Sequence, residues 1–461
     1  MMTNLTFTPL SKLRRMLRDK KISSVELTQH FLDRLAQHGP KYNALAELTP
    51  DLALAQAKQA DQLLKKGEHN SPLLGIPYGA KDLLATKGIP TRWGSPAHQD
   101  QVPEVDATTV LRLREAGAPL LGKLAMVEIA GGGGYSLPSA SLHGPGLNPW
   151  NVNTWSGGSS SGSGSAVAAG LVPFALGSET WGSIVTPSTY CGITGLRPTY
   201  GLVSRFGAME LAWTMDKVGP MAHSAEDCGL ILQAIAGPDR LDLTATGKFK
   251  FRPRKKQHHK LRLGVLPADF SGEPELEQVF QAALEVLHKA GMKIKPVELP
   301  KHDYAGIANT LLYAEMAGAH EAFIKSDKLD LLVNGPQKEG LRNALTYTAA
   351  QTIQAQQQKL QATHDLLQLF DEFDALVSPS LMIEAPSLDT DLRTAFKRRG
   401  GYSVLGALCG VPALALPMGF GKSGLPLGLN ITGNLFDENT ILHIGMVYQR
   451  ETDWHERRPP I

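Results

Sequence analysis

Residues 157–187 read GGSSSGSGSAVAAGLVPFALGSETWGSIVTP, and this stretch decides how the rest of the sequence is interpreted. Gly, Ser and Thr are so frequent from Trp155 to Gly207 that composition alone would suit a flexible linker. Apolar runs interrupt them, however, in AVAAGLVPFALGS and again in CGITGLRPTYGLVS. Glycines set among apolar residues indicate backbones that approach one another closely. We therefore predict a packed site rather than a linker.

Ser183 is a candidate nucleophile in this stretch. It follows Gly182 in GSETWGSIVTPS, where consecutive backbone N–H groups can turn toward one point. Such a group of donors forms an oxyanion hole, which stabilises the negative oxygen of a tetrahedral intermediate. Any Gly-Ser turn would look similar, so the segment by itself is a weak signal.

Ser160 is a rival nucleophile, because Gly158, Ser160 and Gly162 match the Gly-x-Ser-x-Gly elbow of α/β-hydrolases. That elbow needs an apolar strand directly before the serine, whereas NPWNVNTWSG is polar and rich in turn-forming residues. A phosphate-binding glycine loop is a third interpretation. The stretch lacks the Lys-Ser/Thr ending of a P-loop and the spacing of a dinucleotide fingerprint, so both alternatives are minor.

Lys81 is the candidate base, and it lies among apolar residues in GIPYGAKDLLATKG. Burial would lower its pKa and make the neutral amine available. On local sequence alone, a surface lysine paired with Asp82 is the more common situation. Histidine offers no better base, because His143, His223 and His320 lie in unrelated contexts and no His-x-x-x-His pair suggests a metal.

The composition of the whole chain is that of a globular protein. Its 461 residues are 42% hydrophobic and 20% charged. A total of 46 Lys and Arg against 44 Asp and Glu gives a net charge of +2, with no general attraction to nucleic acid or membrane. Cys191, Cys228 and Cys409 lack the paired spacing of a disulfide framework or a zinc site. With no export signal and no apolar run of ~20 residues, we expect a soluble, cytoplasmic chain.

Hydrophobic periodicity predicts alternation of helices and strands. Helical spacing recurs from Leu10 to Leu64, and Ser23 or Ser24 with Glu26 can cap one of these helices. The run ATTVLRLREAGAPLLGKLAMVEIA predicts a helix, a Gly turn and a buried strand. Further helices are predicted at PELEQVFQAALEVLHKAG, LLYAEMAGAHEAF, ALTYTAAQTIQAQQQKLQATHDLLQLF and DENTILHIGMVYQRETDWHE, and strands at LRLGVL, DALVSPS, ALALPMGF and GLPLGLNITG.

A basic run is the strongest local concentration of charge. Residues 248–262 hold eight Lys and Arg and could contact phosphates. The balanced net charge favours a solvated connector instead. We expect a single domain over residues 1–461, with a catalytic core at about 70–220 and a basic connector at about 247–262.

Three segments taken together resemble the amidase signature family, and the resemblance covers nearly the whole chain. They are GIPYGAKD, GGSSSGSGSAVAAG and GSETWGSIVTP, in the order in which that family carries them. The resemblance implies a triad without histidine, in which Lys81 is the base, Ser159 the bridging serine and Ser183 the nucleophile. It also implies an α/β fold with a large mixed central sheet covered by helices.

The same resemblance implies the surroundings of the triad. Backbone N–H groups of Thr180, Trp181, Gly182 and Ser183 would form the oxyanion hole, and Ser160 would support the triad. The implied substrate-binding residues are Ile129, Gly131, Gly132, Gly133 and Gly134, with Trp181 and residues 209–213 as further walls.

The sequence departs from the family pattern at four positions. Trp181 stands where the family usually has Gly and adds bulk beside the nucleophile. Val185 stands where the family has Arg, which removes a charged group that usually supports this loop. Ser161 replaces a Gly and Asn430 a Gln. All three triad residues remain, so we expect activity.

The implied activity is hydrolysis of a carboxylic acid amide to an acid and ammonia or an amine, through a serine acyl-enzyme. This would make the chain a hydrolase of C–N bonds in linear amides other than peptide bonds. No metal or organic cofactor enters the scheme. The expected partner is a small-molecule amide, without membrane or nucleic acid, and self-association into a homo-oligomer is left open.

Two alternatives remain. The family includes one of the chains of glutamyl-tRNA amidotransferase, so the protein could be a glutaminase component that feeds ammonia to charged tRNA. Trp181 and Val185 disfavour that role. The second alternative is a non-catalytic scaffold that keeps the fold. The identity of the amide does not follow from the sequence.

Overall fold

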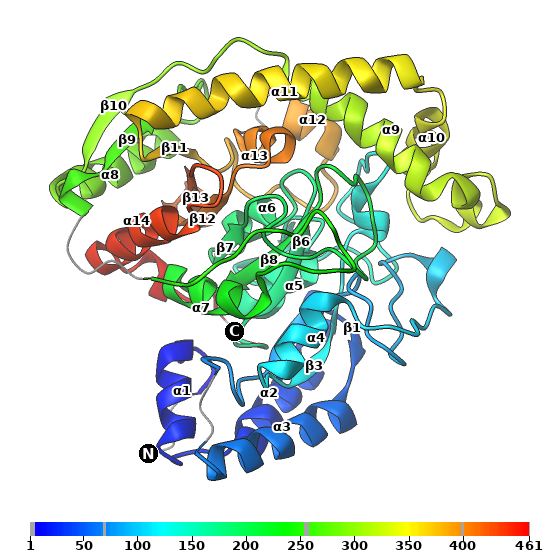
Figure 1. Ribbon diagram of the computed structural model, residues 1–461, viewed down its shortest axis with the longest axis vertical. Helices are drawn as coiled ribbons and strands as arrows, with labels where there is room; N and C mark the ends of the chain where they lie inside the picture. Colours follow the sequence, from blue (N-terminus) through cyan, green and yellow to red (C-terminus); the bar gives the residue numbers. More distant parts are fainter. Residues whose placement is uncertain (1–4, 68–70, 253–257, 398–400, 461) are drawn as a thin grey trace.

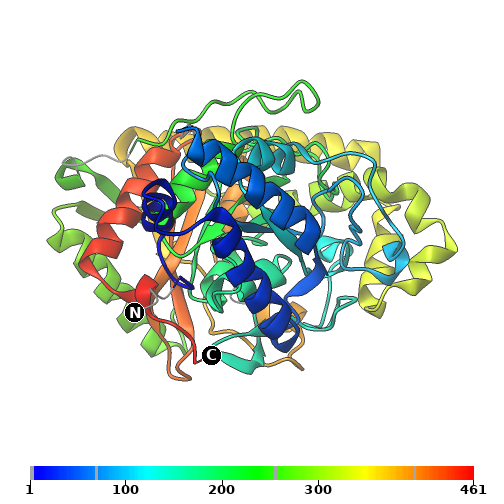
Figure 2. The ribbon, with the colours of Figure 1, turned by 90° about the horizontal axis from the view of Figure 1, so that it is seen from below.

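The computed structural model describes residues 5–67, 71–252, 258–397 and 401–460. These residues fold around an eleven-stranded mixed sheet with helices packed along it (Figures 1 and 2). The predicted α/β class with a large mixed central sheet is confirmed. Over the described residues no helix is long and apolar enough to cross a membrane.

The sheet begins at one edge with N-terminal strands and ends at the other with strands from the second half of the chain. Across it lie β1 (Leu45–Leu48), β3 (Leu120–Leu124), β2 (Tyr78–Lys81), β6 (Ala175–Glu179), β8 (Lys217–Ala222), β7 (Thr194–Arg197), β12 (Ala413–Phe420), β13 (Pro426–Thr432), β11 (Ala375–Pro379), β9 (Arg262–Val265) and β10 (Lys293–Pro296). β2 and β9 are each parallel to both of their neighbours. The other pairs are antiparallel.

The parallel pair β2 and β6 positions the candidate site. Gly79 faces Ala175 across this pair, and both strands run toward the same edge of the sheet. Carboxyl ends of neighbouring parallel strands meet at one edge, where sites are commonly built. Lys81 and Glu179, the last residues of the two strands, are therefore brought to one place.

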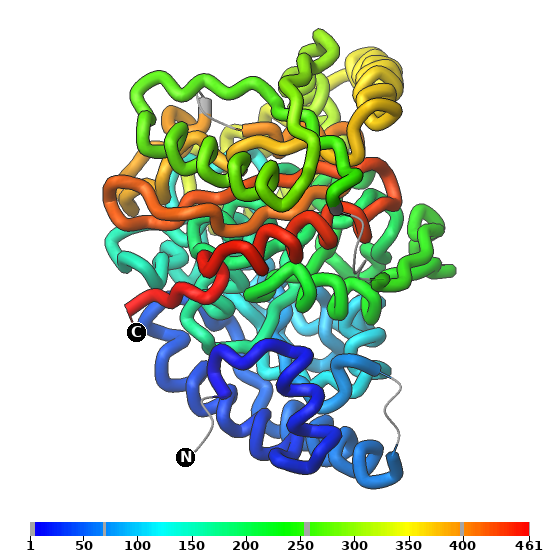
Figure 3. Tube along the Cα trace, turned by 90° about the vertical axis from the view of Figure 1, so that its left-hand side faces the viewer, coloured from blue at the N-terminus to red at the C-terminus, as the bar shows by residue number. Residues whose placement is uncertain are grey.

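Helices lie along the sheet and at both ends of the molecule (Figures 1 and 3). The N-terminal helices lie at one end of the molecule and α9 and α11 at the other (Figures 1 and 3). The helices are α1 (Leu10–Arg18), α2 (Ser24–His38), α3 (Pro50–Lys65), α4 (Thr108–Glu115), α5 (Ser161–Ala168), α6 (Val185–Tyr190), α7 (Ala225–Ile235), α8 (Pro274–Lys289), α9 (Tyr304–Ile324), α10 (Gly335–Ala344), α11 (Ala349–Glu372), α12 (Leu392–Lys397), α13 (Ser403–Cys409) and α14 (Glu438–Glu451).

The Gly- and Ser-rich stretch is packed, as predicted. All eight residues of α5 are buried. A Cβ added at Gly162 would lie 2.5 Å from the carbonyl oxygen of Ala44 and 2.6 Å from the backbone nitrogen of Ala125. Small residues are therefore required here, because the helix lies directly against neighbouring backbone.

Most predicted elements are present. Ser23 caps α2 and Glu26 completes a capping box, while the Gln-rich helix begins only at Ala349, because the side chain of Thr348 caps it. One element was not predicted: within the polar stretch NPWNVNTWSG and the residue before it, Leu147–Asn148 (β4) and Asn151–Trp155 (β5) pair as a hairpin outside the main sheet.

Two sequence predictions on organisation stay predictions. Residues 253–257 of the basic run lie outside the described residues. The division into a catalytic core and a connector is likewise untested by the fold.

Candidate active site

Lys81 is fully buried at the carboxyl end of β2. Its Nζ donates to Ser159 Oγ at 2.7 Å and to Ser178 Oγ at 3.0 Å. Burial lowers the pKa of Lys81 to about 7, although the negative charges of Asp216 and Glu179 act in the opposite direction. The interpretation as a surface lysine paired with Asp82 was wrong, because the Asp82 carboxylate faces Lys123 at 3.9 Å.

Ser159 and Ser160 lie in the turn between β5 and α5. Ser159 is buried beside the lysine, and its carbonyl oxygen accepts from Val127 N at 3.1 Å. The hydroxyl of Ser160 donates to Ser178 O at 3.1 Å and accepts from Ser178 N at 3.3 Å. Ser160 thus connects the turn to β6, which is compatible with a supporting role.

Ser183 lies in the turn between β6 and α6. Its carbonyl oxygen accepts from Ser160 N at 3.3 Å. Gly182 has φ of +82°, a left-handed conformation that glycine adopts without a steric penalty. Within the part of the chain that the structure describes, no hydrogen bond uses the backbone N–H of Trp181, Gly182 or Ser183 as donor. Unused donors beside a serine are what an oxyanion hole requires.

Ser183 opens on a cavity of about 540 Å³. Its walls are mainly apolar and aromatic, from the turns before α5 and α6 and from α9, α12 and α13. The lining residues are Ala130, Gly131, Tyr135, Trp155, Gly158, Thr180, Trp181, Gly182, Ser183, Thr186, Leu211, Asn309, Leu312, Leu381, Arg393, Phe396 and Ser403.

Of the predicted substrate-binding residues 129 and 131–134, Gly131 lines this cavity. Its neighbour Ala130, which was not predicted, also lines it. Ile129 is fully buried. The other predicted residues in this segment, Gly132, Gly133 and Gly134, are not among the lining residues. Leu211 from the predicted wall at 209–213 does line it. Binding of substrate by this segment stays a prediction.

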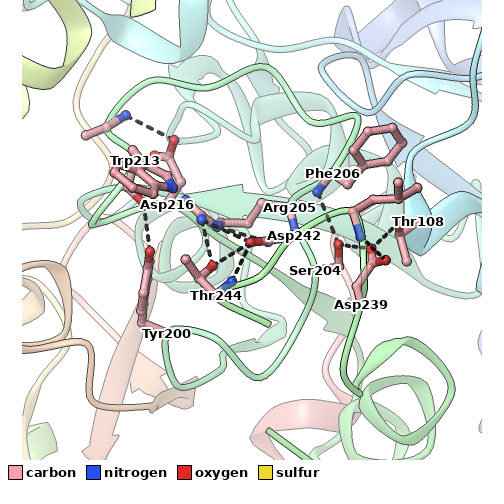
Figure 4. Close-up of polar contacts among 12 residues, drawn as sticks. Thr108, Tyr200, Ser204, Arg205, Phe206, Trp213, Asp216, Asp239, Asp242 and Thr244 are labelled. Carbon is pink, nitrogen blue, oxygen red and sulfur yellow. Dashed lines mark hydrogen bonds and ion pairs between the residues drawn. The ribbon is translucent and has the colours of Figure 1, made fainter. Parts of the chain in front are cut away.

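A smaller cavity of about 170 Å³ adjoins the first and shares Ala130, Thr180 and Leu211 with it. Arg205 and Asp242 line it and form an ion pair, and Arg205 Nη2 also donates to Thr244 Oγ1 at 2.8 Å (Figure 4).

The departures from the family pattern have different surroundings. Trp181 packs against a core cluster that includes residues of α13 and also lines the larger cavity. Val185 is fully buried. Ser161 Oγ donates to Ala125 O at 3.5 Å, and Asn430 Nδ2 donates to Thr432 Oγ1 at 3.0 Å.

Sequence analysis missed several polar residues of the site. Asp216 accepts from Thr180 Oγ1 and from Leu211 N, and burial raises its pKa. The ion pair of Glu179 and Arg197, at 2.7 Å, was also missed. A signal for it existed, because Glu179, Arg197 and Arg205 are the only charged residues between positions 155 and 207. Opposite charges in a packed, otherwise uncharged stretch indicate an ion pair.

Comparisons with known proteins agree on the family. The sequence profile named Amidase matches residues 26–442. Over 484 aligned positions the chain is 37% identical to the GatA-type chain of glutamyl-tRNA(Gln) amidotransferase from Coxiella burnetii, covering 98% of this chain and 99% of the relative. The corresponding Methylococcus capsulatus protein is 37% identical over 482 positions, with 98% of each chain covered. Among solved structures, native peptide amidase from Stenotrophomonas maltophilia is similar, with a TM-score of 0.85, 31% identity and 98% of each chain covered.

Proposed function

The chain belongs to the Amidase family, and on that premise we propose that it hydrolyses a carboxylic acid amide, with Ser183 as nucleophile, Ser159 as proton relay and Lys81 as base. The observation that carries the proposal is the 2.7 Å hydrogen bond from Lys81 Nζ to Ser159 Oγ, made by a fully buried lysine. A lysine with a pKa of about 7 has a substantial neutral fraction at neutral pH and can accept a proton.

In the first half of the reaction, Lys81 takes a proton from Ser159, and Ser159 takes one from Ser183. The oxygen of Ser183 attacks the amide carbonyl, and the new C–O bond gives a tetrahedral oxyanion. The N–H groups of Trp181, Gly182 and Ser183, which donate to no other residue that the structure describes, are the donors proposed to stabilise it. The N–H of Thr180 is the fourth member of the predicted oxyanion hole.

In the second half, the relay runs backward and protonates the leaving nitrogen, so that the C–N bond breaks and ammonia or an amine departs. A water molecule then attacks the acyl-enzyme with the same base. The acid leaves, and the hydroxyl of Ser183 is restored. The balance is one amide and one water consumed for one acid and one ammonia or amine.

A fluorophosphonate probe and a panel of short aliphatic, aryl and amino-acid amides test this proposal. The wild-type chain should label at Ser183, and Ser183→Ala should lose labelling and lower kcat by roughly 10³-fold or more. Ser160→Ala is the matched control, since this serine is buried in the same site. Full turnover by Ser183→Ala together with an inactive Ser160→Ala would transfer the nucleophile to Ser160.

A component of an amidotransferase complex is the second candidate, because relatives named for that enzyme match at 37% identity over nearly the full length. Trp181 and Val185 favour the free-standing amidase. Purification separates the two: a stable partner chain and glutamine-dependent amide transfer to charged tRNA would establish the second function. Absence of any labelling in a folded wild-type chain would instead favour a non-catalytic scaffold.

A further inference from the structure

Glu179 ends β6, directly before the turn that carries Ser183, and it is fully buried. Its Oε2 accepts from Ile184 N at 2.8 Å and from Val185 N at 3.0 Å. These are the first two amides after Ser183. The carboxylate therefore joins the start of the turn to its end and fixes the four residues between them.

Arg197 approaches the same carboxylate from β7. Its Nη1 donates to Glu179 Oε1 at 2.7 Å, and both side chains are 0% exposed. The guanidinium also donates to Ser403 O and to Val411 O, each at 3.2 Å. Ser403 is the first residue of α13 and lines the larger cavity. One carboxylate oxygen of Glu179 thus accepts from backbone amides of the turn, and the other accepts from Arg197.

The surroundings keep Glu179 charged. Burial by itself would raise the pKa of this carboxyl, but Arg197, Lys217 and the Val185 amide hold the pKa below its ordinary value. Lys217 also contacts the turn, since its Nζ donates to Thr180 O at 3.4 Å. The turn is therefore held by a carboxylate with full acceptor strength.

We propose that Glu179 is the positioning residue of the nucleophile turn and that Arg197 orients its carboxylate. The inference rests on the proposed role of Ser183 as nucleophile. It predicts that turnover depends on the hydrogen-bond acceptor at position 179, and not only on the stability that an ion pair confers.

Two double variants, E179Q/R197M and E179M/R197M, isolate the acceptor. Both remove one negative and one positive buried charge together, so the net charge of the core is the same in the two variants. Only the glutamine keeps an oxygen that can accept from the Ile184 and Val185 amides. E179M/R197M should therefore have a kcat at least about ten-fold below that of E179Q/R197M, with KM values within about two-fold. The rate of fluorophosphonate labelling should change in the same proportion.

The ion pair of Arg262 and Asp374 provides a control. Arg262 begins β9 and Asp374 directly precedes β11, their side chains are 44% and 32% exposed, and neither residue lines either cavity. R262M/D374N should keep kcat within about two-fold of wild type, which would show that the loss of an ion pair does not by itself lower turnover. Activity is expressed per folded molecule, with folding checked by circular dichroism.

Equal kcat values for the two double variants would overturn the inference. If E179M/R197M does not fold, E179A/R197M takes its place, because alanine also lacks an acceptor for the Ile184 and Val185 amides. A kcat equal to that of E179Q/R197M would then overturn the inference. S183A distinguishes a failure of the proposed function from a failure of this inference. Turnover in S183A contradicts the proposed function. An inactive S183A, together with equal kcat values for the two double variants, contradicts only the role of Glu179.

Discussion

Lys81 lies beside two serine hydroxyls, and its protonation state governs the proposed reaction. Because the neutral amine is the base, kcat/KM should rise with pH through about 7 and fall below it. Lys81→Met should lower kcat/KM by roughly 10²-fold or more. A pH–rate profile with an uncharged amide measures both effects.

Asp216→Asn tests the assignment of that acidic limb to Lys81. The charge of Asp216 raises the pKa of the lysine, so its removal should move the limb to lower pH. An acidic limb that stays in place would show that another group titrates. The change in kcat on the plateau reports separately on the contact between Asp216 and Thr180.

Trp181 is a third residue whose substitution should change the kinetics. It lines the larger cavity beside the nucleophile. Trp181→Gly removes this wall and should raise kcat/KM for bulky aryl amides relative to acetamide by about ten-fold. Trp454→Gly is the control, because Trp454 packs against Phe420 near the carboxyl terminus and lines neither of the two cavities. If kcat/KM for aryl amides relative to acetamide is unchanged in Trp181→Gly, the aryl group of the substrate does not contact Trp181.

At the scale of elements, α13 depends on a glycine that faces Arg197. A Cβ added at Gly406 would lie 1.5 Å from Arg197 Nη2, so Gly406→Ala must displace the guanidinium or the helix. We expect a loss of about 2 kcal/mol or more in the free energy of unfolding, from denaturant titration, together with a lower kcat.

Gly318 within α9 is the matched control for that substitution. Nothing lies within 4 Å of a Cβ added there. Because alanine has the higher helix propensity, Gly318→Ala should raise the free energy of unfolding by up to ~1 kcal/mol and leave kcat unchanged. Similar effects of the two alanines on stability would contradict the close contact at Gly406.

At the scale of the whole molecule, a hydrogen bond to Asp227 on α7 connects the N-terminal helix α1 to the rest of the fold. Its Oδ1 accepts from Leu10 N at 3.1 Å, and burial raises its pKa to about 7. The folded pKa lies above the ordinary value of 3.8, so the folded state binds this proton more tightly. The corresponding stability is fully present below about pH 4 and is lost as pH rises through about 7.

Asp227→Asn removes this dependence while keeping an oxygen that can accept from Leu10. The free energy of unfolding of the variant relative to wild type should therefore increase between about pH 4 and about pH 7. Urea titrations of both proteins at several pH values measure the difference. A difference that does not vary with pH would show that Asp227 does not titrate in this range.

Much of the fold could be predicted from the sequence because its signals are local. The capping box at Ser23 and the strand at residues 375–379 depend on neighbours within a few positions. The hairpin at residues 147–155 was missed, because its polar sequence resembles turns and only pairing with another segment makes it a strand.

The sequence by itself determined the family and the candidate triad, because Lys81, Ser159 and Ser183 lie in short contiguous segments with recognisable neighbours. Only the tertiary structure decided what holds the nucleophile turn. Glu179 and Arg197 are 18 positions apart and meet because β6, β8 and β7 lie side by side in the sheet. Ser178 joins Lys81 for the same reason, since its place depends on β6 pairing with β2. Contacts across strands are set by which distant segments pair, and no local pattern of residues specifies that pairing.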